Sequence, residues 1–161
     1  MKHAWLLAAA LAACTSVDER SDWERKNAQK VAAAEEPVVL PAYPRKDQLI
    51  EFSVAPASEF RFYVDAASIS VAKEVVYYAM VARSKAGVEN VTFEGMRCAT
   101  GEVRIYAVGR DGSWAGRPGE WRPRGDERWR NALYREYFCP VGQAIGSREA
   151  AVAALRTGGA R

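Results

Sequence analysis

The amino-acid sequence predicts an α+β protein: mainly an antiparallel β-sheet, shaped as a sandwich or half-barrel, with one or two C-terminal helices and one disulfide. First, runs of alternating apolar and polar residues follow one another between residues 48 and 107 without a helical pattern between them, which favours antiparallel strands. Second, apolar residues recur at every fourth position between 126 and 138, the spacing of a helix with one buried face. Third, Cys98 and Cys139 lie in the same region. A hydrophobic share of 49% suits one compact domain.

Each expected strand has the pattern of its place in a sheet. Strands with one buried face alternate apolar and polar residues, as residues 50–54, 60–65 and 103–107 do. The run from Val75 to Ala82 is almost entirely apolar, as a central strand buried on both faces requires. Residues 84–87 turn the chain into a further strand over 88–94, and Asp111-Gly112 marks a tight turn.

Two helices are expected after the strands. Over residues 126–138, Trp129, Leu133 and Tyr137 make one apolar face, and Pro140 ends the helix. We expect Trp129 in the core, with Arg128 and Arg130 flanking that face in solvent.

The second helix is expected from a cap at Ser147 to Arg156, ending at Gly158 and Gly159.

The N-terminus has the pattern of an export signal. Lys2 and His3 precede an apolar run over residues 4–13, which is too short to span a bilayer. The run ends in Leu-Ala-Ala-Cys14, which resembles the lipobox of bacterial lipoproteins. That resemblance implies cleavage before Cys14 and acylation of Cys14, so that lipid chains anchor the protein to a membrane. Thr15 is not the aspartate that retains such proteins at the inner membrane, which favours the periplasmic face of the outer membrane.

These features predict four parts of the chain. Residues 1–13 are the signal peptide, 14–47 the lipidated cysteine and a tether, 48–158 a single globular domain, and 159–161 a tail. The tether has the Ser-x-x-Glu pattern of a capping box at Ser21 to Glu24. It ends in Leu40-Pro41-Ala42-Tyr43-Pro44, which proline geometry holds extended.

Cleavage would remove the single histidine of the chain. His3 lies in the signal, so the mature protein, 161 minus 13 or 148 residues, has no imidazole. This excludes Ser-His-Asp and Cys-His catalysis and most zinc sites. The net charge falls from +3 to about +2, too small to steer anionic partners strongly. We therefore expect no cofactor and no metal.

Cys98 and Cys139 are the cysteines that remain. In an oxidising compartment such a pair predicts a disulfide. It would close a loop of about 41 residues and stabilise the fold by roughly 4 kcal/mol on the chain-entropy model. A two-thiol metal site is the alternative.

Several segments resemble the cryptic-neisserial-protein-like lipoproteins of Gram-negative bacteria, a family without a characterised function. The resemblance covers roughly residues 40–140, and its most specific block is Glu94-Gly95-Met96-Arg97-Cys98. Further segments are Leu40 to Pro44, Asp65 with Ser68-Ile69-Ser70-Val71, Asn90 to Phe93, Tyr106 to Arg110, Trp114, and Tyr137-Phe138-Cys139-Pro140. The resemblance implies a lipid anchor and a disulfide, but no substrate and no catalytic residue. The tether is longer here than in that pattern.

An arginine-rich and tryptophan-rich stretch from residue 97 to residue 135 is the expected functional surface. Arginine binds carboxylates and phosphates with a planar fork and stacks on aromatic rings. The partner would be an envelope protein or an anionic glycan or lipid of the envelope. An exported protein seldom meets nucleic acid, which is therefore not expected. The candidate binding residues are Trp114, Arg117, Trp121, Arg122, Arg124, Glu94 and Arg97.

Some of these residues have a structural alternative. Glu94 and Arg97 are expected to form an internal ion pair near the disulfide. Trp114 would either cover the end of a hairpin or stack on a ligand. The leading hypothesis is a membrane-anchored binding or assembly module.

The alternative function is a carboxylate-dependent hydrolase of cell-wall glycans. Glu94, Asp65 and Glu102 lie on or beside strands and are the candidate carboxylates. Ser70-Val71-Ala72-Lys73 matches the Ser-x-x-Lys of penicillin-binding proteins, but the partner motifs are absent and Ser70 falls in a strand-like segment. No catalytic residue is assigned.

Overall fold

The computed structural model describes residues 38–54, 58–116 and 118–160. One compact unit extends from Val39 to Arg161, so residues 39–47 of the expected tether belong to it. Cys14, the expected capping box and Arg117 lie outside the described residues. No helix within the described part of the chain is long and apolar enough to cross a membrane.

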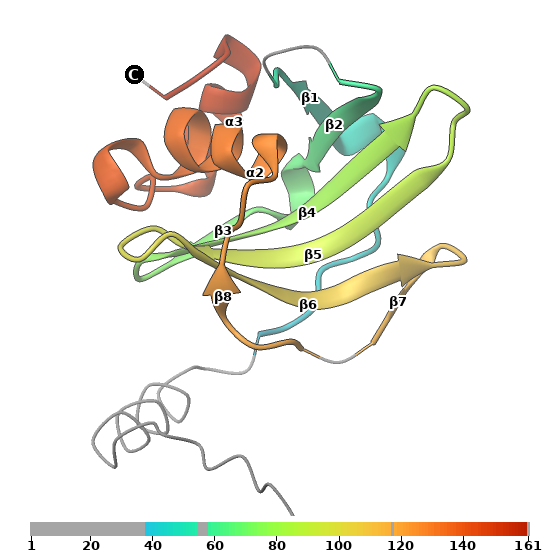
Figure 1. The fold of residues 1–161 in the computed structure, drawn as a ribbon, viewed down its shortest axis with the longest axis horizontal. Coiled ribbons are helices and arrows are strands. Elements are labelled where there is room, and N and C mark those ends of the chain that lie inside the picture. The colour runs from blue at the N-terminus through green and yellow to red at the C-terminus, as the bar shows by residue number, and fades with distance from the viewer. Residues whose placement is uncertain (1–37, 55–57, 117, 161) are drawn as a thin grey trace, which may run out of the picture. The chain divides into compact units, whose positions relative to one another are not determined.

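A single twisted sheet forms the centre of the unit (Figure 1). Its strands are antiparallel and run in the order β1-β2-β4-β5-β6-β7, with β3 paired to β4 and β8 paired to β6. A sandwich would need a second sheet, and all described strands belong to one. The strands are β1 (Leu49–Phe52), β2 (Phe60–Asp65), β3 (Ser70–Ala72), β4 (Val75–Ser84), β5 (Glu89–Arg97), β6 (Glu102–Arg110), β7 (Ser113–Ala115) and β8 (Arg122–Pro123).

The apolar run predicted as a central strand is confirmed. β4 lies between β2 and β5, and six of its residues from Val76 onward are buried: Val76, Tyr78, Ala79, Met80, Val81 and Ala82. Even-numbered side chains of β4 join the main core and Val81 joins a small cluster on the other face, because successive side chains in a strand point to opposite faces.

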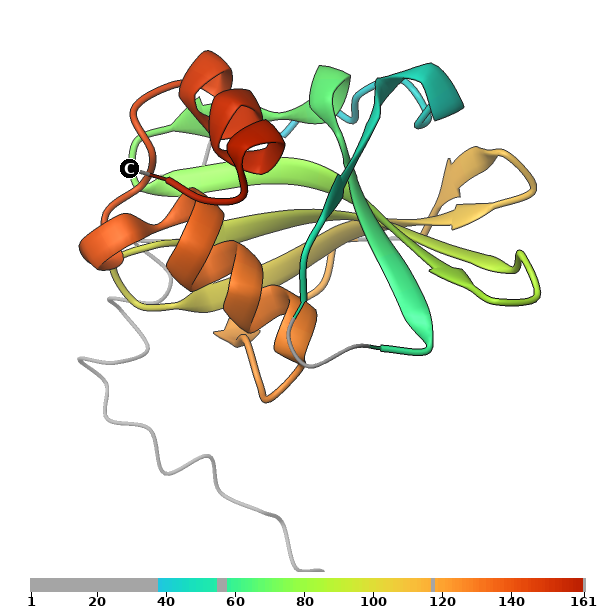
Figure 2. The same ribbon diagram turned by 90° about the horizontal axis from the view of Figure 1, so that it is seen from above.

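Helical segments follow the sheet and cover one of its faces (Figure 2). They are α2 (Arg128–Ala132), the π-helix η3 (Leu133–Phe138), the 3-10 turn η4 (Pro140–Gly142) and α3 (Arg148–Thr157). Two further 3-10 turns, η1 (Lys46–Gln48) and η2 (Ala66–Ser68), flank the first two strands. In Figure 2 the β4–β5 and β6–β7 hairpins extend beyond the helices.

Both predicted helices are present, with one difference. The first begins at Arg128 and not at 126, and its second half has the wider π form, ending with Cys139 N–H donating to Tyr134 O over 2.9 Å. The second is as expected: Ser147 Oγ accepts from Ala150 N–H, and Gly158 ends it in the left-handed region.

The predicted disulfide joins Cys98 at the end of β5 to Cys139 after η3. Both cysteines are buried, and the bond fastens the end of the first helix to the sheet. The metal-site alternative for this pair is therefore replaced by the disulfide.

Candidate functional site

A buried ion pair joins the first helix to the sheet, and it corrects two expectations. Arg130 is 5% exposed and not in solvent. Its Nε and Nη2 donate to the two carboxylate oxygens of Glu94 over 3.0 and 2.9 Å. Glu94 pairs with Arg130 and not with Arg97, because residues three apart on a strand point to opposite faces. Arg97 instead donates from Nη1 to Glu102 Oε2 over 2.9 Å.

The Glu94 carboxylate has its hydrogen-bonding capacity filled. Besides Arg130, it accepts from Thr92 Oγ1 over 2.9 Å and from Tyr78 Oη over 3.2 Å. Burial alone would lower the pKa of Arg130, but the hydrogen bonds and the charge of Glu94 raise it above its ordinary value. Burial and the charge of Glu94 raise the pKa of Tyr78 well above its ordinary value. The network thus holds a fixed charge pair.

The other two candidate carboxylates are also engaged. Asp65 is buried and accepts from Ala67 N–H over 3.0 Å, while Glu102 accepts from Arg97 and from Thr100 Oγ1. Each of these two carboxylates therefore has its own hydrogen-bond donors, and the two lie in different parts of the fold. Within the described part of the chain, no group of three or more His, Cys, Asp or Glu side chains could hold a metal ion.

On the face of the sheet away from the helices, aromatic rings gather around Gly95. A Cβ on Gly95 would lie 3.0 Å from Tyr106, 3.2 Å from Tyr77 and 3.3 Å from Trp121. The Arg97 guanidinium stacks over the Trp121 ring at 4.1 Å from its centroid. We call these five residues the Gly95 cluster. It is a packed group that brings together two of the candidate residues, Arg97 and Trp121.

Trp114 covers a different part of the same face. Its Nε1–H donates to Pro41 O over 2.8 Å, and its ring lies 5.0 Å from the Tyr43 ring and 6.1 Å from that of Phe93. Residues 38–48 pass behind β5 and β6 in Figure 1, in cyan. In the structure Trp114 thus packs against Pro41 and Tyr43 and against Phe93 of β5.

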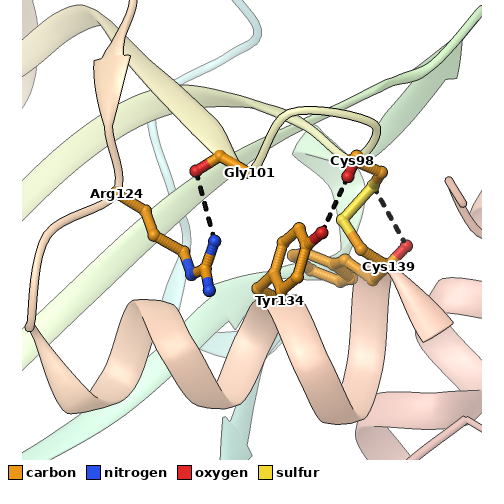
Figure 3. The surroundings of a disulfide bond; sticks show 6 residues. Cys98, Gly101, Arg124, Tyr134 and Cys139 are labelled. Carbon is orange, nitrogen blue, oxygen red and sulfur yellow. Dashed lines mark hydrogen bonds between the residues drawn. A yellow bond between two sulfur atoms is a disulfide. The ribbon is translucent and has the colours of Figure 1, made fainter. Parts of the chain in front are cut away.

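Arg124 holds the β8 segment against the first helix (Figure 3). Its Nε donates to Asn131 Oδ1 over 2.8 Å and its Nη1 to Gly101 O over 3.4 Å. The guanidinium lies over the Tyr134 ring at 4.1 Å, and Tyr134 Oη donates to Cys98 O over 2.8 Å. Arg124 is thereby connected to the disulfide.

Beside Arg124, the loop after β8 and the exposed side of α2 and η3 enclose a shallow cleft of about 410 Å³. Arg128 and Arg135 both line this cleft, so they lie on the same side of the helical segment. Both are exposed. We call this the arginine cleft, lined by Arg124, Gly125, Asp126, Arg128, Asn131, Ala132, Arg135 and Glu136.

The structure thus divides the predicted surface. Trp121 and Arg97 lie in the Gly95 cluster, Trp114 at the other end of that face, and Arg124 in the arginine cleft. Arg122 is exposed on β8, next to β6. Arg128 and Arg135 belong to the arginine-rich stretch of the sequence but were not among the candidate residues, although their spacing on a predicted helix already places them together.

Fold and site together define a disulfide-bonded α+β protein with one antiparallel sheet, C-terminal helices on one face and an arginine-lined cleft. The model of the CNP1-like family matches residues 28–156, and the chain belongs to this family. The family expected from the sequence is therefore confirmed. Neither the curated proteins nor the solved structures compared with this chain gave a match.

Proposed function

We propose that this chain is a lipoprotein anchored at the periplasmic face of the outer membrane, whose folded unit binds an anionic envelope component through the arginine cleft. Membership of the CNP1-like family is consistent with this proposal. The lipobox-like ending at Cys14 supports the anchor. The ligand class is argued from the cleft itself.

The anionic nature of the ligand is inferred from Arg128 and Arg135, whose guanidinium groups are not held in ion pairs with described residues. Among the described residues, neither forms an ion pair, unlike Arg45, Arg61, Arg83, Lys85, Arg97 and Arg130. Two exposed guanidiniums on one side of a helix offer charge-assisted hydrogen bonds to a carboxylate or phosphate. Lipid phosphates and peptidoglycan carboxylates carry such groups.

The acidic residues of the cleft limit what can bind. Asp126 and Glu136 line the same cleft, so a densely charged polyanion would meet repulsion beside each arginine. A ligand with one or two separated anionic groups fits this arrangement better. Nucleic acid is disfavoured for the same reason.

The cleft can be tested with the double variant Arg128→Gln plus Arg135→Gln. Binding of purified protein to peptidoglycan fragments and to vesicles containing phosphatidylglycerol is expected to fall about tenfold or more, because two charge-assisted hydrogen bonds are lost. Arg110→Gln is the control, since Arg110 is also exposed and lies outside the cleft at the far end of β6. Equal binding by the double variant and the control would refute the cleft as the contact surface.

The anchor has its own test. Cys14→Ser is expected to release the protein into the soluble periplasmic fraction while leaving its circular dichroism spectrum unchanged. Membrane association that persists in this variant would contradict the lipid anchor without bearing on the cleft.

A further inference from the structure

A second cleft lies at the opposite edge of the sheet from the arginine cleft. Helix α3 packs against β1, which is one end of the strand order, whereas β8 pairs with β6 at the other end. Between α3, η1 and η2 there is a cleft of about 580 Å³, within the size range of small-molecule sites. It is lined by Gln48, Ala66, Arg148, Glu149, Val152, Ala153, Arg156 and Thr157.

The cleft is apolar in the middle and basic at its ends. Arg148, Val152 and Arg156 follow one another at four-residue spacing, so they form one stripe along α3. The Cα atoms of the two arginines are about 12 Å apart at 1.5 Å per residue. Val152, Ala153 and Ala66 supply small aliphatic surface between them.

Both guanidiniums are available to a ligand. Arg148 Nε donates to Ala66 O over 3.1 Å, a contact that fixes its side chain along the cleft. Neither Arg148 nor Arg156 belongs to an ion pair within the part of the chain that the structure describes. Acidic groups of that part of the chain therefore act on these two arginines only through longer-range charge interactions.

Two acids, Glu149 and Asp65, lie near Arg148 and interact with its charge. Hydrogen bonds from the backbone N–H of Glu149 and from Ser147, together with the charge of Arg148, lower the pKa of Glu149. Asp65 is buried and accepts from Ala67 N–H. Among the described residues, no carboxylate lines the Arg156 end of the cleft.

We propose that this cleft binds an amphiphilic anion, an aliphatic chain ending in a carboxylate or a phosphate. The anionic head would lie at the guanidinium of Arg156, and the chain would run along Val152 and Ala153 toward Arg148. Guanidinium favours both head groups through charge-assisted hydrogen bonds, and the aliphatic floor favours the chain by removing it from water. This site is separate from the arginine cleft and does not depend on it.

The test is a titration of the isotope-labelled mature chain, carrying Cys14→Ser, followed by nuclear magnetic resonance. The probes are octyl phosphate, octanoate, inorganic phosphate and octyl glucoside, each below its micelle concentration. Octyl phosphate or octanoate is expected to give saturable shifts at Val152, Ala153 and Arg156. The relative affinity of these two probes identifies the preferred head group.

Two variants and one control make the test specific. Arg156→Gln is expected to weaken octyl phosphate about tenfold, the loss of one charge-assisted hydrogen bond. Ala153→Phe, at an exposed position, should fill the cleft and abolish the saturable shifts. Arg110→Gln, exposed at the end of β6 and outside both clefts, should leave these shifts unchanged. Equal binding of octyl glucoside or of inorganic phosphate, shifts confined to other regions, or no saturation would each overturn the proposal.

Discussion

At the scale of the single residue, Gly95 lies where any side chain would require its neighbours to move. Rings of Tyr77, Tyr106 and Trp121 lie 3.0 to 3.3 Å from where its Cβ would be, closer than side-chain contacts normally allow. A hydrogen at this position lets three rings close over the strand. The identity of residue 95 is therefore set by residues that are distant in sequence.

Gly95→Ala is expected to lower the free energy of unfolding by about 1–3 kcal/mol, since the rings must move apart. Urea unfolding followed by tryptophan fluorescence would measure this, because Trp121 is one of the rings. Gly146→Ala is the control, as nothing lies within 4 Å of its Cβ position. Two variants of equal stability would contradict the packing argument.

The burial of Asp65 makes the free energy of unfolding depend on pH. Burial raises the pKa of its carboxyl, and hydrogen bonding from Ala67 and the charge of Arg148 offset this only in part. The folded state therefore holds the proton more tightly than the unfolded state, and stability falls as pH rises through the folded pKa.

Asp65→Asn keeps the acceptor for Ala67 N–H and has no charge to bury. Its stability relative to wild type is expected to increase between pH 3 and pH 7, measured by urea unfolding. Asp47→Asn should behave in the opposite sense, because hydrogen bonds from Arg45 lower the pKa of Asp47 in the folded state. A constant difference between Asp65→Asn and wild type would contradict the linkage.

At the scale of elements, the Glu94–Arg130 pair joins α2 to β5. The pair is buried on both sides, with side-chain exposures of 0% and 6%, so solvent screens it little. Removing one partner would leave the other as an uncompensated buried charge. This contact therefore determines where α2 lies on the sheet.

Arg130→Ala is expected to cost about 3–5 kcal/mol of unfolding free energy. Arg128→Ala, two residues earlier and exposed, should change stability by no more than about 0.5 kcal/mol. Replacing both Glu94 and Arg130 by methionine should recover much of the loss, since no charge is then buried alone. Should the double replacement be no more stable than Arg130→Ala, the loss comes from packing and not from charge.

At the scale of the whole molecule, the compact unit begins nine residues before the domain boundary expected from composition. Residues 39–47 belong to that unit, and Tyr43 and Pro41 contact Trp114 on β7. Tyr43 also lies against Gly109, where a Cβ would be 2.5 Å from its hydroxyl. The segment contributes to folding and is more than a spacer.

A fragment starting at residue 48 is expected to be less stable than one starting at 39 by about 2 kcal/mol or more. The loss combines an aromatic pair, a hydrogen bond and buried tyrosine surface. Thermal unfolding of both fragments would measure it. Trp114→Phe in the longer fragment isolates the hydrogen bond, at about 1 kcal/mol. Identical melting temperatures for the two fragments would return the boundary to residue 48.

Most of the fold could be predicted because its signals are local. Alternation identified the strands near Phe62 and Ile105, the apolar run identified β4 as central, and Ser147 and Gly158 marked the ends of α3. The site could be predicted only in part. The arginine-rich stretch could be recognised in the sequence. Its residues, however, lie on the two faces of the sheet and on the side of a helix, so the sequence alone suggests one surface where the structure has several.

The sequence by itself determined the fold class, the family and the pairing of the two core cysteines, because periodicity, motifs and cysteine number are properties of the chain. Only the tertiary structure decided which charges meet. Glu94 binds Arg130, which is 36 residues away, and not Arg97, three residues away. The strand directs the side chains of Glu94 and Arg97 to opposite faces of the sheet. Packing of the helix then brings the distant Arg130 over the buried Glu94 carboxylate.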